Sequence, residues 1–341
     1  MWLISTVLKK YYRFIVIILF VGCQQINTNN IKKINGYALG TSYSITYLSE
    51  SLESNILITH IDSITKLINK SMSTYIDDSD ISKVNKGDSL LKVDIHFQKV
   101  YNTANRVWEK TEGYFDPTVG ALVNAYGFGP EKKLKSITES KKNDLLKYTG
   151  WNKIQLTPKN TIQKKDPNIF IDFNALAKGY TVDLIANHLR KNNVTSFLVE
   201  IGGEIVAEGK SPRTGNLWKV AIDNPKQGKN REFIRTLSLK NQALATSGNY
   251  RKYKIDEKSG RRIVHSVNPK TGNPFPTNVL SASVISSECM IADAYATSLM
   301  VMPFEKGKAM VNRELDIEAF WIIENEEGLI EQHFSKDFPR K

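Results

Sequence analysis

The chain contains little cysteine: two residues, Cys23 and Cys289, in a length of 341. Two cysteines cannot supply the framework of disulfides that stabilises small secreted domains. Histidine is also sparse, and no pair among the five histidines has the spacing of a metal-ligating motif. A disulfide-rich fold and a zinc site are therefore not expected, and we expect Cys289 to be a small buried residue.

The apolar run near the N-terminus, residues 14–22, is too short to span a bilayer comfortably. Basic residues precede this run and Cys23 follows it directly, as in a bacterial lipoprotein signal. We therefore expect residues 1–22 to be a signal peptide that is removed, and Cys23 to be lipidated. Phe20 departs from such signals, which usually have leucine there. The alternative is an uncleaved N-terminal anchor.

The segment after Cys23 is polar and rich in asparagine, as expected for a tether between a membrane and a folded domain. We assign residues 23–33 to this tether and residues 34–341 to one domain that faces the periplasm. With 41% hydrophobic residues, the chain is long enough to bury a large core.

The formal net charge of +12 is not gathered into a basic stripe, because lysines and acidic residues are mixed along the chain. The sequence also has no zinc-finger spacing and no basic motif interleaved with aromatic residues. A nucleic-acid partner is therefore not expected. The charge indicates a mild attraction for anionic substrates or membrane surfaces.

Apolar periodicity and capping residues predict a sequence of helices and strands. Helices are expected over residues 57–68, from an Asp94 cap to Gly113, from a Ser136 cap to Gly150, over 174–191, and from a Ser286 or Ser287 cap to Met302. Strands are expected over residues 41–47, 169–173, 218–222, 263–265 and 279–285, with a glycine-interrupted strand over 197–206 and a loop over 245–250.

The last of these helices is almost wholly apolar, yet its apolar face carries the carboxylate of Asp293 and the hydroxyl of Thr297. The two residues are one helical turn apart and point the same way. A buried, unpaired carboxylate is costly, and a hard cation with oxygen ligands, Mg²⁺ first, suits this pair. The alternative is that Asp293 is only hydrogen-bonded, or paired with a lysine or arginine.

Three further stretches are candidates for a functional site. The helix predicted over 174–191 opens with small residues and Lys178, a start whose free N–H groups and dipole favour a phosphate, although the spacing is not that of a Walker loop. His265 lies where a predicted strand runs into a turn, and it is either a hydrogen-bonded structural histidine or a functional group. The aromatic residues of the loop 126–130 either pack in the core or bind a flat ring.

Several short motifs, taken in their order along the chain, resemble the ApbE family of FAD:protein FMN transferases. They are Leu-Gly-Thr at 39–41, Met-Ser-Thr-Tyr at 72–75, Phe-Asp-Pro-Thr-Val-Gly at 115–120, Ile-Asp-Phe-Asn-Ala-Leu-Ala-Lys-Gly-Tyr at 171–180, Val-Glu-Ile-Gly-Gly-Glu at 199–204, Ala-Thr-Ser-Gly at 245–248, His265 with Pro-Lys-Thr-Gly at 269–272, and Ala-Asp-Ala-Tyr-Ala-Thr at 292–297. The resemblance covers nearly all of residues 36–302.

The resemblance implies a fold and an activity. The fold is an α+β, mixed-sheet, two-lobed domain (T-fold-like) with FAD in the cleft between the lobes. The activity is Mg²⁺-dependent transfer of FMN from FAD to a threonine hydroxyl of a target protein, with release of AMP. The implied partners are flavin-carrying subunits of a membrane electron-transfer complex, such as a sodium-pumping NADH:quinone oxidoreductase.

The resemblance also assigns roles to individual residues. His265 matches a histidine that assists catalysis, and Ala175 (through its carbonyl), Asp293 and Thr297 match metal ligands. Matches to FAD-contacting positions are Leu39, Tyr75, Tyr114, Phe115, Asp116, Asp172, Lys178 and Val267.

Three positions depart from the family pattern. Leu39 stands where methionine is common, and Asn174 stands where glycine or serine is frequent. Asn268 stands where aspartate is common, which questions any acid role there. Two other functions stay open: a Mg²⁺-dependent FAD pyrophosphatase that uses water as the acceptor, and a lipoprotein that only stores flavin.

Overall fold

The computed structural model describes residues 30–134, 137–226, 230–250, 253–256, 260–275, 277–314 and 316–339. The predicted signal peptide, the predicted lipidation site Cys23 and the predicted helix cap Ser136 lie outside these ranges. Residues 31–33, which we assigned to the tether, belong to strand β1 (Ile31–Ala38). The folded domain therefore begins before residue 34.

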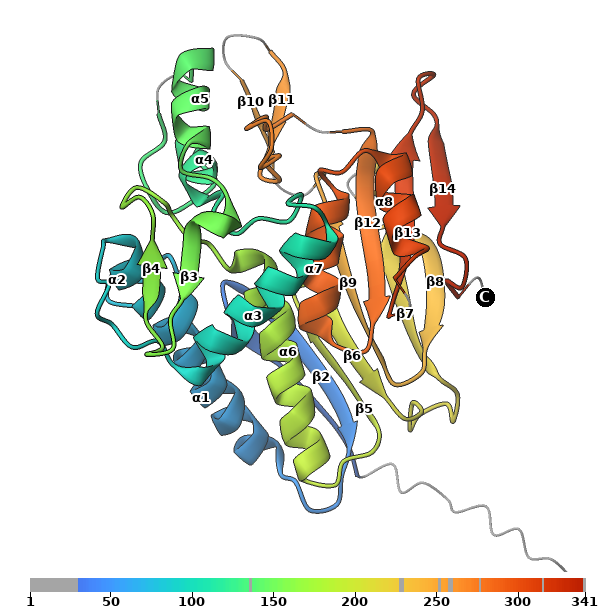
Figure 1. The fold of residues 1–341 in the computed structure, drawn as a ribbon. Coiled ribbons are helices and arrows are strands. Elements are labelled where there is room, and N and C mark those ends of the chain that lie inside the picture. Colours follow the sequence, from blue (N-terminus) through green and yellow to red (C-terminus); the bar gives the residue numbers. More distant parts are fainter. Residues whose placement is uncertain are drawn as a thin grey trace, which may run out of the picture.

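An eight-stranded sheet forms the centre of the fold (Figure 1). Its strands, in spatial order, are β1, β2 (Thr41–Leu48), β5 (Phe197–Ile201), β6 (Glu204–Glu208), β9 (Gln242–Gly248), β12 (Val279–Ser286), β13 (Ile317–Glu324) and β14 (Ile330–Phe334). Every pairing in this sheet is antiparallel. The predicted α+β class is confirmed, but the sheet is antiparallel where we expected mixed strand directions.

Four helices lie on one side of the sheet and form the main core with it (Figure 1). They are α1 (Ser54–Met72), α3 (Ile95–Lys110), α6 (Asn174–Lys191) and α7 (Cys289–Leu299). Three of them pack on strands of the sheet, whereas α3 packs on the other helices. The helical spacing of apolar residues places buried side chains on one side of α1, among them Leu57, Ile61 and Ile64. Asp94 caps α3 as predicted, because its side chain accepts the N–H of Phe97.

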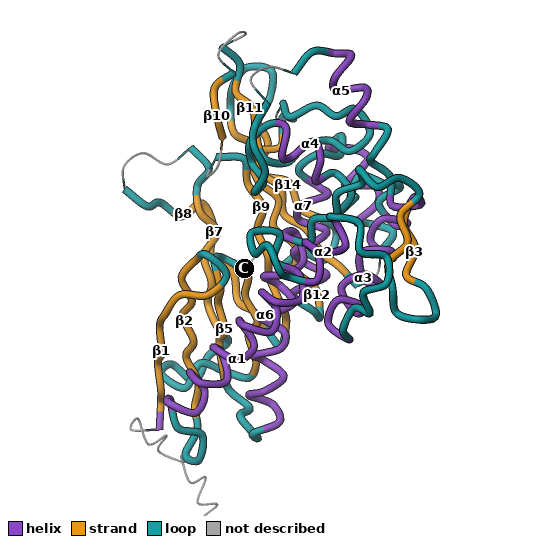
Figure 2. Tube along the Cα trace, turned by 90° about the vertical axis from the view of Figure 1, so that its left-hand side faces the viewer, coloured by secondary structure: helices purple, strands orange, loops and turns teal. Residues whose placement is uncertain are grey.

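The opposite face of the sheet is covered by a hairpin of β7 (Trp218–Asp223) and β8 (Phe233–Leu239). Figure 2 shows this hairpin on one side of the strands and α1 and α6 on the other. A second apolar cluster fills the contact, with Trp218, Leu239 and Phe320 among its buried members. A short helix, α8 (Phe304–Val311), packs against β13.

A separate group of short elements lies beyond the end of the helical layer (Figure 1). It contains α2 (Asp80–Asn85), α4 (Gly120–Ala125), α5 (Glu139–Leu146), a 3₁₀ turn (Trp151–Lys153) and the hairpins β3 (Ile154–Leu156)–β4 (Ile162–Lys164) and β10 (Tyr253–Ile255)–β11 (Arg262–Val264). No helix in the described part of the chain is both long and apolar enough to cross a membrane.

Four local predictions need correction. The segment 169–173 is buried but makes only an isolated bridge from Phe170 to Val119, so it is not a strand. The stretch 197–206 is a hairpin, β5–β6, in which Gly202 and Gly203 adopt positive φ at the turn. The predicted loop 245–250 mostly belongs to β9. The cap of α5 is Thr138, where we predicted Ser136, because the Thr138 hydroxyl accepts the N–H of Lys141.

The start of α7 also differs from the prediction. Neither Ser286 nor Ser287 caps it. The carboxylate of Asp183, on α6, accepts the N–H groups of Cys289 and Met290 at 2.8 and 2.9 Å. A residue of one helix thus satisfies the free donors at the start of another. This cap joins the two helices that carry Ala175, Lys178, Asp293 and Thr297 of the predicted site.

Candidate functional site

A cavity of about 810 Å³ lies between the sheet–helix layer and the group of short elements. This volume is in the range of small-molecule and cofactor sites. Its walls come from the turn after β1, the end of α1, the loop before α4, the start of α6, the β5–β6 turn, β9, the segment after β11, and α7. Every described residue that we predicted for the site lines it, namely Leu39, Tyr75, Tyr114, Phe115, Asp116, Asp172, Ala175, Lys178, His265, Val267, Asp293 and Thr297.

Asp293 is buried where α7 crosses the start of α6. Its Oδ2 atom accepts the N–H of Gly179 at 3.2 Å and lies 3.5 Å from the Lys178 ammonium. The close crossing needs glycine at position 179, because a Cβ there would lie 2.5 Å from the carbonyl oxygen of Cys289. Burial raises the pKa of Asp293, although Lys178 and the Gly179 N–H oppose this.

Glu204 brings a second carboxylate to Lys178. It is buried as the first residue of β6, and its Oε1 accepts the ammonium at 2.9 Å. Burial raises the pKa of Glu204 to about 7 against the attraction of Lys178, and the charge of Asp293 adds to the rise. Burial alone would lower the pKa of Lys178, but the two carboxylates outweigh it and raise this pKa above its usual range.

The oxygen atoms near α7 suit a hard divalent cation. The Thr297 hydroxyl, one turn after Asp293, lies 3.3 Å from the hydroxyl of Ser247 on β9. The second oxygen of Glu204, Oε2, is buried without a hydrogen-bond partner in the described part of the chain. Ala175, whose carbonyl we predicted as a ligand, lines the same cavity. A carboxylate, a hydroxyl and a carbonyl are the ligands Mg²⁺ prefers, so the residues fit it.

No cluster of three or more histidine, cysteine, aspartate or glutamate side chains with metal-binding geometry occurs among the described residues. The candidate cation site would therefore consist of the Asp293 carboxylate, the neutral oxygens of Thr297 and Ala175, and oxygen atoms supplied by a bound substrate. In general, Mg²⁺ needs few protein ligands where water and substrate phosphates complete its coordination.

Aromatic and apolar residues line the part of the cavity nearest its opening. Tyr75 is 58% exposed, and its hydroxyl reaches the carbonyl of Phe128 at 3.5 Å. Leu39 has a φ of 50° in the turn between β1 and β2, a conformation that is uncommon for leucine. Lys270 and Lys306 lie over the ring of Tyr114, at 4.7 and 5.3 Å from its centroid. The rings of Tyr75 and Tyr114 are surfaces on which a flat ring could stack, and the two lysines bring positive charge next to Tyr114.

Asp116 is held by four donors. Its carboxylate accepts the N–H and the hydroxyl of Thr118, the N–H of Trp151 and the indole N–H of Trp108. Burial raises the pKa of Asp116 even against these hydrogen bonds. The Asp116 side chain therefore fixes the loop that carries Tyr114 and Phe115. Because its oxygens are occupied by these four donors, we expect the backbone of this loop, and not the Asp116 carboxylate, to contact a ligand.

His265 is half-buried in the cavity wall directly after β11. Its ring meets Phe128 edge-on with 6.3 Å between centroids, and its carbonyl accepts the N–H of Val267 at 3.1 Å. In the loop 126–130, Phe128 is buried and lines the cavity, and the Tyr126 hydroxyl donates to the Gly272 carbonyl at 2.9 Å. Binding of a flat ring by this loop stays a prediction. At the start of α6, Asp172 accepts the N–H of Asn174 at 2.8 Å.

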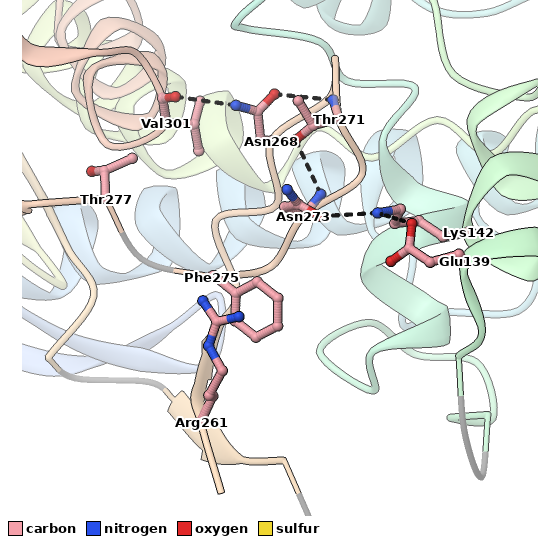
Figure 3. A pocket seen from close by; sticks show the side chains of 9 residues that line it. All are labelled: Glu139, Lys142, Arg261, Asn268, Thr271, Asn273, Phe275, Thr277 and Val301. Carbon is pink, nitrogen blue, oxygen red and sulfur yellow. Dashed lines mark hydrogen bonds and ion pairs between the residues drawn. The ribbon is translucent and has the colours of Figure 1, made fainter. Parts of the chain in front are cut away.

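A second cavity, of about 550 Å³, lies on the far side of the segment after His265 (Figure 3). Asn268 lines this second cavity, where its amide donates to the carbonyl of Val301 at 3.3 Å and accepts the N–H of Lys270 at 2.9 Å. Figure 3 shows the Asn268 side chain between Val301 and Thr271. An aspartate could not make the first of these bonds. Asn268 therefore shapes a turn and takes no acid role.

Sequence reasoning assigned no role to Glu204, Asp183 or Ser247. The signal for the two acids was present, since each occupies a position where the pattern of its strand or helix predicts burial. A carboxylate at such a position needs a partner, as Asp293 does. The strand that carries Ser247 was predicted as a loop, so the side on which this hydroxyl lies could not be foreseen.

Comparisons with known proteins give a consistent result. The sequence model of the ApbE family matches residues 39–321. The chain is 34% identical to the FAD:protein FMN transferase of Haemophilus influenzae over 318 residues, with 90% of each chain covered. It is also 34% identical to the FAD:protein FMN transferase of Vibrio cholerae, with 92% of this chain and 93% of that relative covered.

Solved structures agree with the sequence comparisons. The flavin transferase ApbE from Vibrio cholerae superposes with a TM-score of 0.80 at 33% identity, covering 90% of this chain and 98% of that one. The apo form of the Pseudomonas stutzeri flavinyl transferase ApbE gives the same TM-score at 28% identity, covering 90% of this chain and 95% of that one.

Proposed function

The chain belongs to the ApbE family and is a flavin transferase, and we propose that it moves FMN from FAD to a threonine hydroxyl of a target protein. The observation that carries this proposal is the convergence of all the described site positions on one cavity. The acceptor residue and the need for Mg²⁺ go beyond what the relatives' names state and are part of the proposal.

In the proposed reaction, the threonine oxygen attacks the phosphorus on the FMN side of the pyrophosphate. A new phosphoester bond forms to the threonine, the bond between the two phosphates breaks, and AMP leaves with that electron pair. The hydroxyl proton must be removed as the oxygen attacks. His265 lies in the cavity wall and supplies an imidazole that can accept this proton.

The charge of the pyrophosphate needs positive partners. Lys178 presents its ammonium at the start of α6, where it lines the cavity and is 31% exposed. Asp293, Thr297 and the Ala175 carbonyl would hold Mg²⁺, which when bound neutralises phosphate oxygens and fixes their orientation. Tyr75, Tyr114 and Leu39 line the opening and would contact the rings of FAD.

The experiment combines purified protein, FAD, Mg²⁺ and a candidate target, followed by peptide mass mapping of the target. Transfer gives AMP and a threonine-containing peptide heavier by one FMN less water. Free FMN as the only flavin product, with a competent target present, would instead assign a FAD pyrophosphatase. If the protein bound FAD but did not convert it, the remaining function would be that of a lipoprotein that only stores flavin.

We also propose where the reaction takes place. Lipidation of Cys23 would anchor the chain to a bacterial membrane with the domain on the periplasmic side. The targets would then be flavin-carrying subunits of a membrane electron-transfer complex, such as a sodium-pumping NADH:quinone oxidoreductase. The basic start, the short apolar run and the cysteine after it support the anchor.

A further inference from the structure

Three charged side chains from separate elements meet in the cavity wall. Lys178, on α6, gives its shorter contact, 2.9 Å, to Glu204 on β6 and its longer one, 3.5 Å, to Asp293 on α7. The side chains of the two acids are only 4% and 3% exposed. Water therefore contributes little to stabilising their charges, and the ammonium is shared between them.

The charges of this cluster do not balance by themselves. When both carboxylates are ionised, their two negative charges against one ammonium leave one negative charge in excess, and Glu204 Oε2 has no hydrogen-bond partner within the described ranges. A buried carboxylate oxygen without a partner is costly. The excess charge would attract an additional cation, and Thr297 and Ala175, which line the same cavity as Asp293, would offer it neutral oxygens there.

Lys178 and a divalent cation compete for the same carboxylate, Asp293. Glu204 decides this competition, because it provides the closer partner for the ammonium. Its position is fixed by the tight turn at Gly202 and Gly203 and by the pairing of β5 with β6. Without the charge of Glu204, Asp293 would be the remaining carboxylate for Lys178, and the two would close into a buried ion pair.

We propose that Glu204 is a positioning residue of the cation site, which holds the Lys178 ammonium away from Asp293 and so keeps Asp293 available to Mg²⁺. Nothing in the comparisons assigns this role. The inference rests on the proposed function, since it takes Mg²⁺ as the cation and FAD as the ligand of the cavity.

The test measures binding, not turnover. FAD binding is followed by flavin fluorescence at increasing Mg²⁺, and the Mg²⁺ concentration at half-maximal binding is compared between variants. Loss of a residue that orients a metal ligand typically weakens metal affinity about 10–100-fold. We therefore expect Glu204→Gln to raise the half-maximal Mg²⁺ concentration by about this factor, with thermal unfolding confirming that the variant is folded.

Glu200→Gln is the matched control. Glu200 lies in the same hairpin, where its carboxylate accepts the N–H of Gly203 at 2.7 Å, a bond that glutamine can also accept. This variant should keep the wild-type Mg²⁺ dependence. A Glu204→Gln protein with that same wild-type dependence would overturn the proposal.

A second background separates positioning from direct ligation. In Lys178→Met, the ammonium that Glu204 holds is gone, so adding Glu204→Gln should change the Mg²⁺ dependence of FAD binding little, both variants being measured at the same FAD concentration, below saturation. A shift of undiminished size in this background would make Glu204 a metal ligand and overturn the positioning role. If FAD binding to the wild-type protein did not depend on Mg²⁺, the proposal that Mg²⁺ binds in this cavity would be refuted. The role of Glu204 would then be refuted as well.

Discussion

Asp293 has two donors in the described structure, the Lys178 ammonium and the Gly179 N–H, and both come from the start of α6. The interpretation that Asp293 is paired with a lysine is therefore confirmed, and its role as a metal ligand stays a prediction. The Lys178 pair is long and shared with Glu204. A shared ammonium compensates a buried carboxylate incompletely, and this leaves room for a second cation.

We predict that Asp293→Ala abolishes Mg²⁺-dependent FAD turnover while the protein stays folded. Removal of this carboxylate leaves Lys178 and Glu204 as a balanced pair, so the free energy of unfolding should be unchanged or higher. Turnover assays and thermal unfolding measure the two effects. Asp293→Asn keeps an oxygen that can accept the Gly179 N–H, so this variant measures the effect of losing the negative charge alone. Normal turnover in Mg²⁺ by either variant would show that Asp293 is not a metal ligand.

His265→Ala should reduce the rate of transfer much more than it reduces FAD affinity. A general base contributes about 10²–10⁴-fold to the rate, whereas a wall residue that faces the acceptor contributes little to flavin binding. FAD binding and single-turnover rates are measured side by side. His333→Ala on β14, whose ring pairs with Glu331, is the control for loss of a histidine. Equal losses of affinity and rate would make His265 a binding residue.

At the scale of elements, the contact between α6 and α7 is the structural basis of the site. Gly179 permits the close approach, and Asp183 supplies the cap that α7 lacks in its own sequence. Because Lys178 and Asp293 are carried by these two helices, any change in the crossing would alter the distance between ammonium and carboxylate. The cap is thus a part of the site's geometry although Asp183 is not in the cavity wall.

The cap also predicts a pH dependence of stability. Burial raises the pKa of Asp183 to about 7, whereas aspartate in an unfolded chain has a pKa of about 3.9. The folded state binds this proton more tightly, so the stability it contributes is complete below about pH 4 and is lost as the pH rises through about 7. We therefore expect the free energy of unfolding to fall between pH 5 and pH 8.

Urea unfolding of the wild type and Asp183→Asn at pH 5 and pH 8 tests this. The variant cannot ionise at this position, so its stability should fall less over the interval. Glu204, whose pKa is also raised to about 7, continues to contribute the same downward trend in both proteins. At pH 5 the variant should be less stable by about 1 kcal/mol, since one of the two N–H bonds is impaired. Parallel pH slopes would contradict the assignment.

At the scale of the whole molecule, the cavity is made by segments that lie far apart in the sequence. The sheet, α6 and α7 supply the candidate cation site, and the loops that follow α1 and α3 supply Tyr75 and Tyr114. The predicted two-lobed arrangement corresponds to this division (Figure 1).

The membrane tether is a prediction for the whole protein. In a bacterial host, mass spectrometry of the mature N-terminus should show that residues 1–22 are absent and that Cys23 carries acyl groups. Cys23→Ser should release the protein from the membrane fraction. Purified protein lacking the anchor should still transfer flavin, because no described site residue lies in the N-terminal segment. An intact Met1 would refute the lipoprotein assignment.

Local chemistry made much of the fold predictable. The helical spacing of Leu57 and Ile61 predicts α1, and the Asp94 side chain predicts the start of α3, because both depend on interactions within one or two turns. The buried segment 169–173 was predicted as a strand because apolar runs do not distinguish a strand from buried irregular chain. Pairing partners, which decide that question, lie elsewhere in the sequence.

The sequence by itself determined that Asp293 and Thr297 lie on one face of an apolar helix, because one helical turn fixes their relation. Its motifs also indicated the family, and with it the residues that the cavity brings together. Only the tertiary structure decided that Lys178 is shared between Asp293 and Glu204 and that Asp183 caps α7. These contacts join separate elements, so they depend on how helices and strands pack and not on the pattern within any one of them.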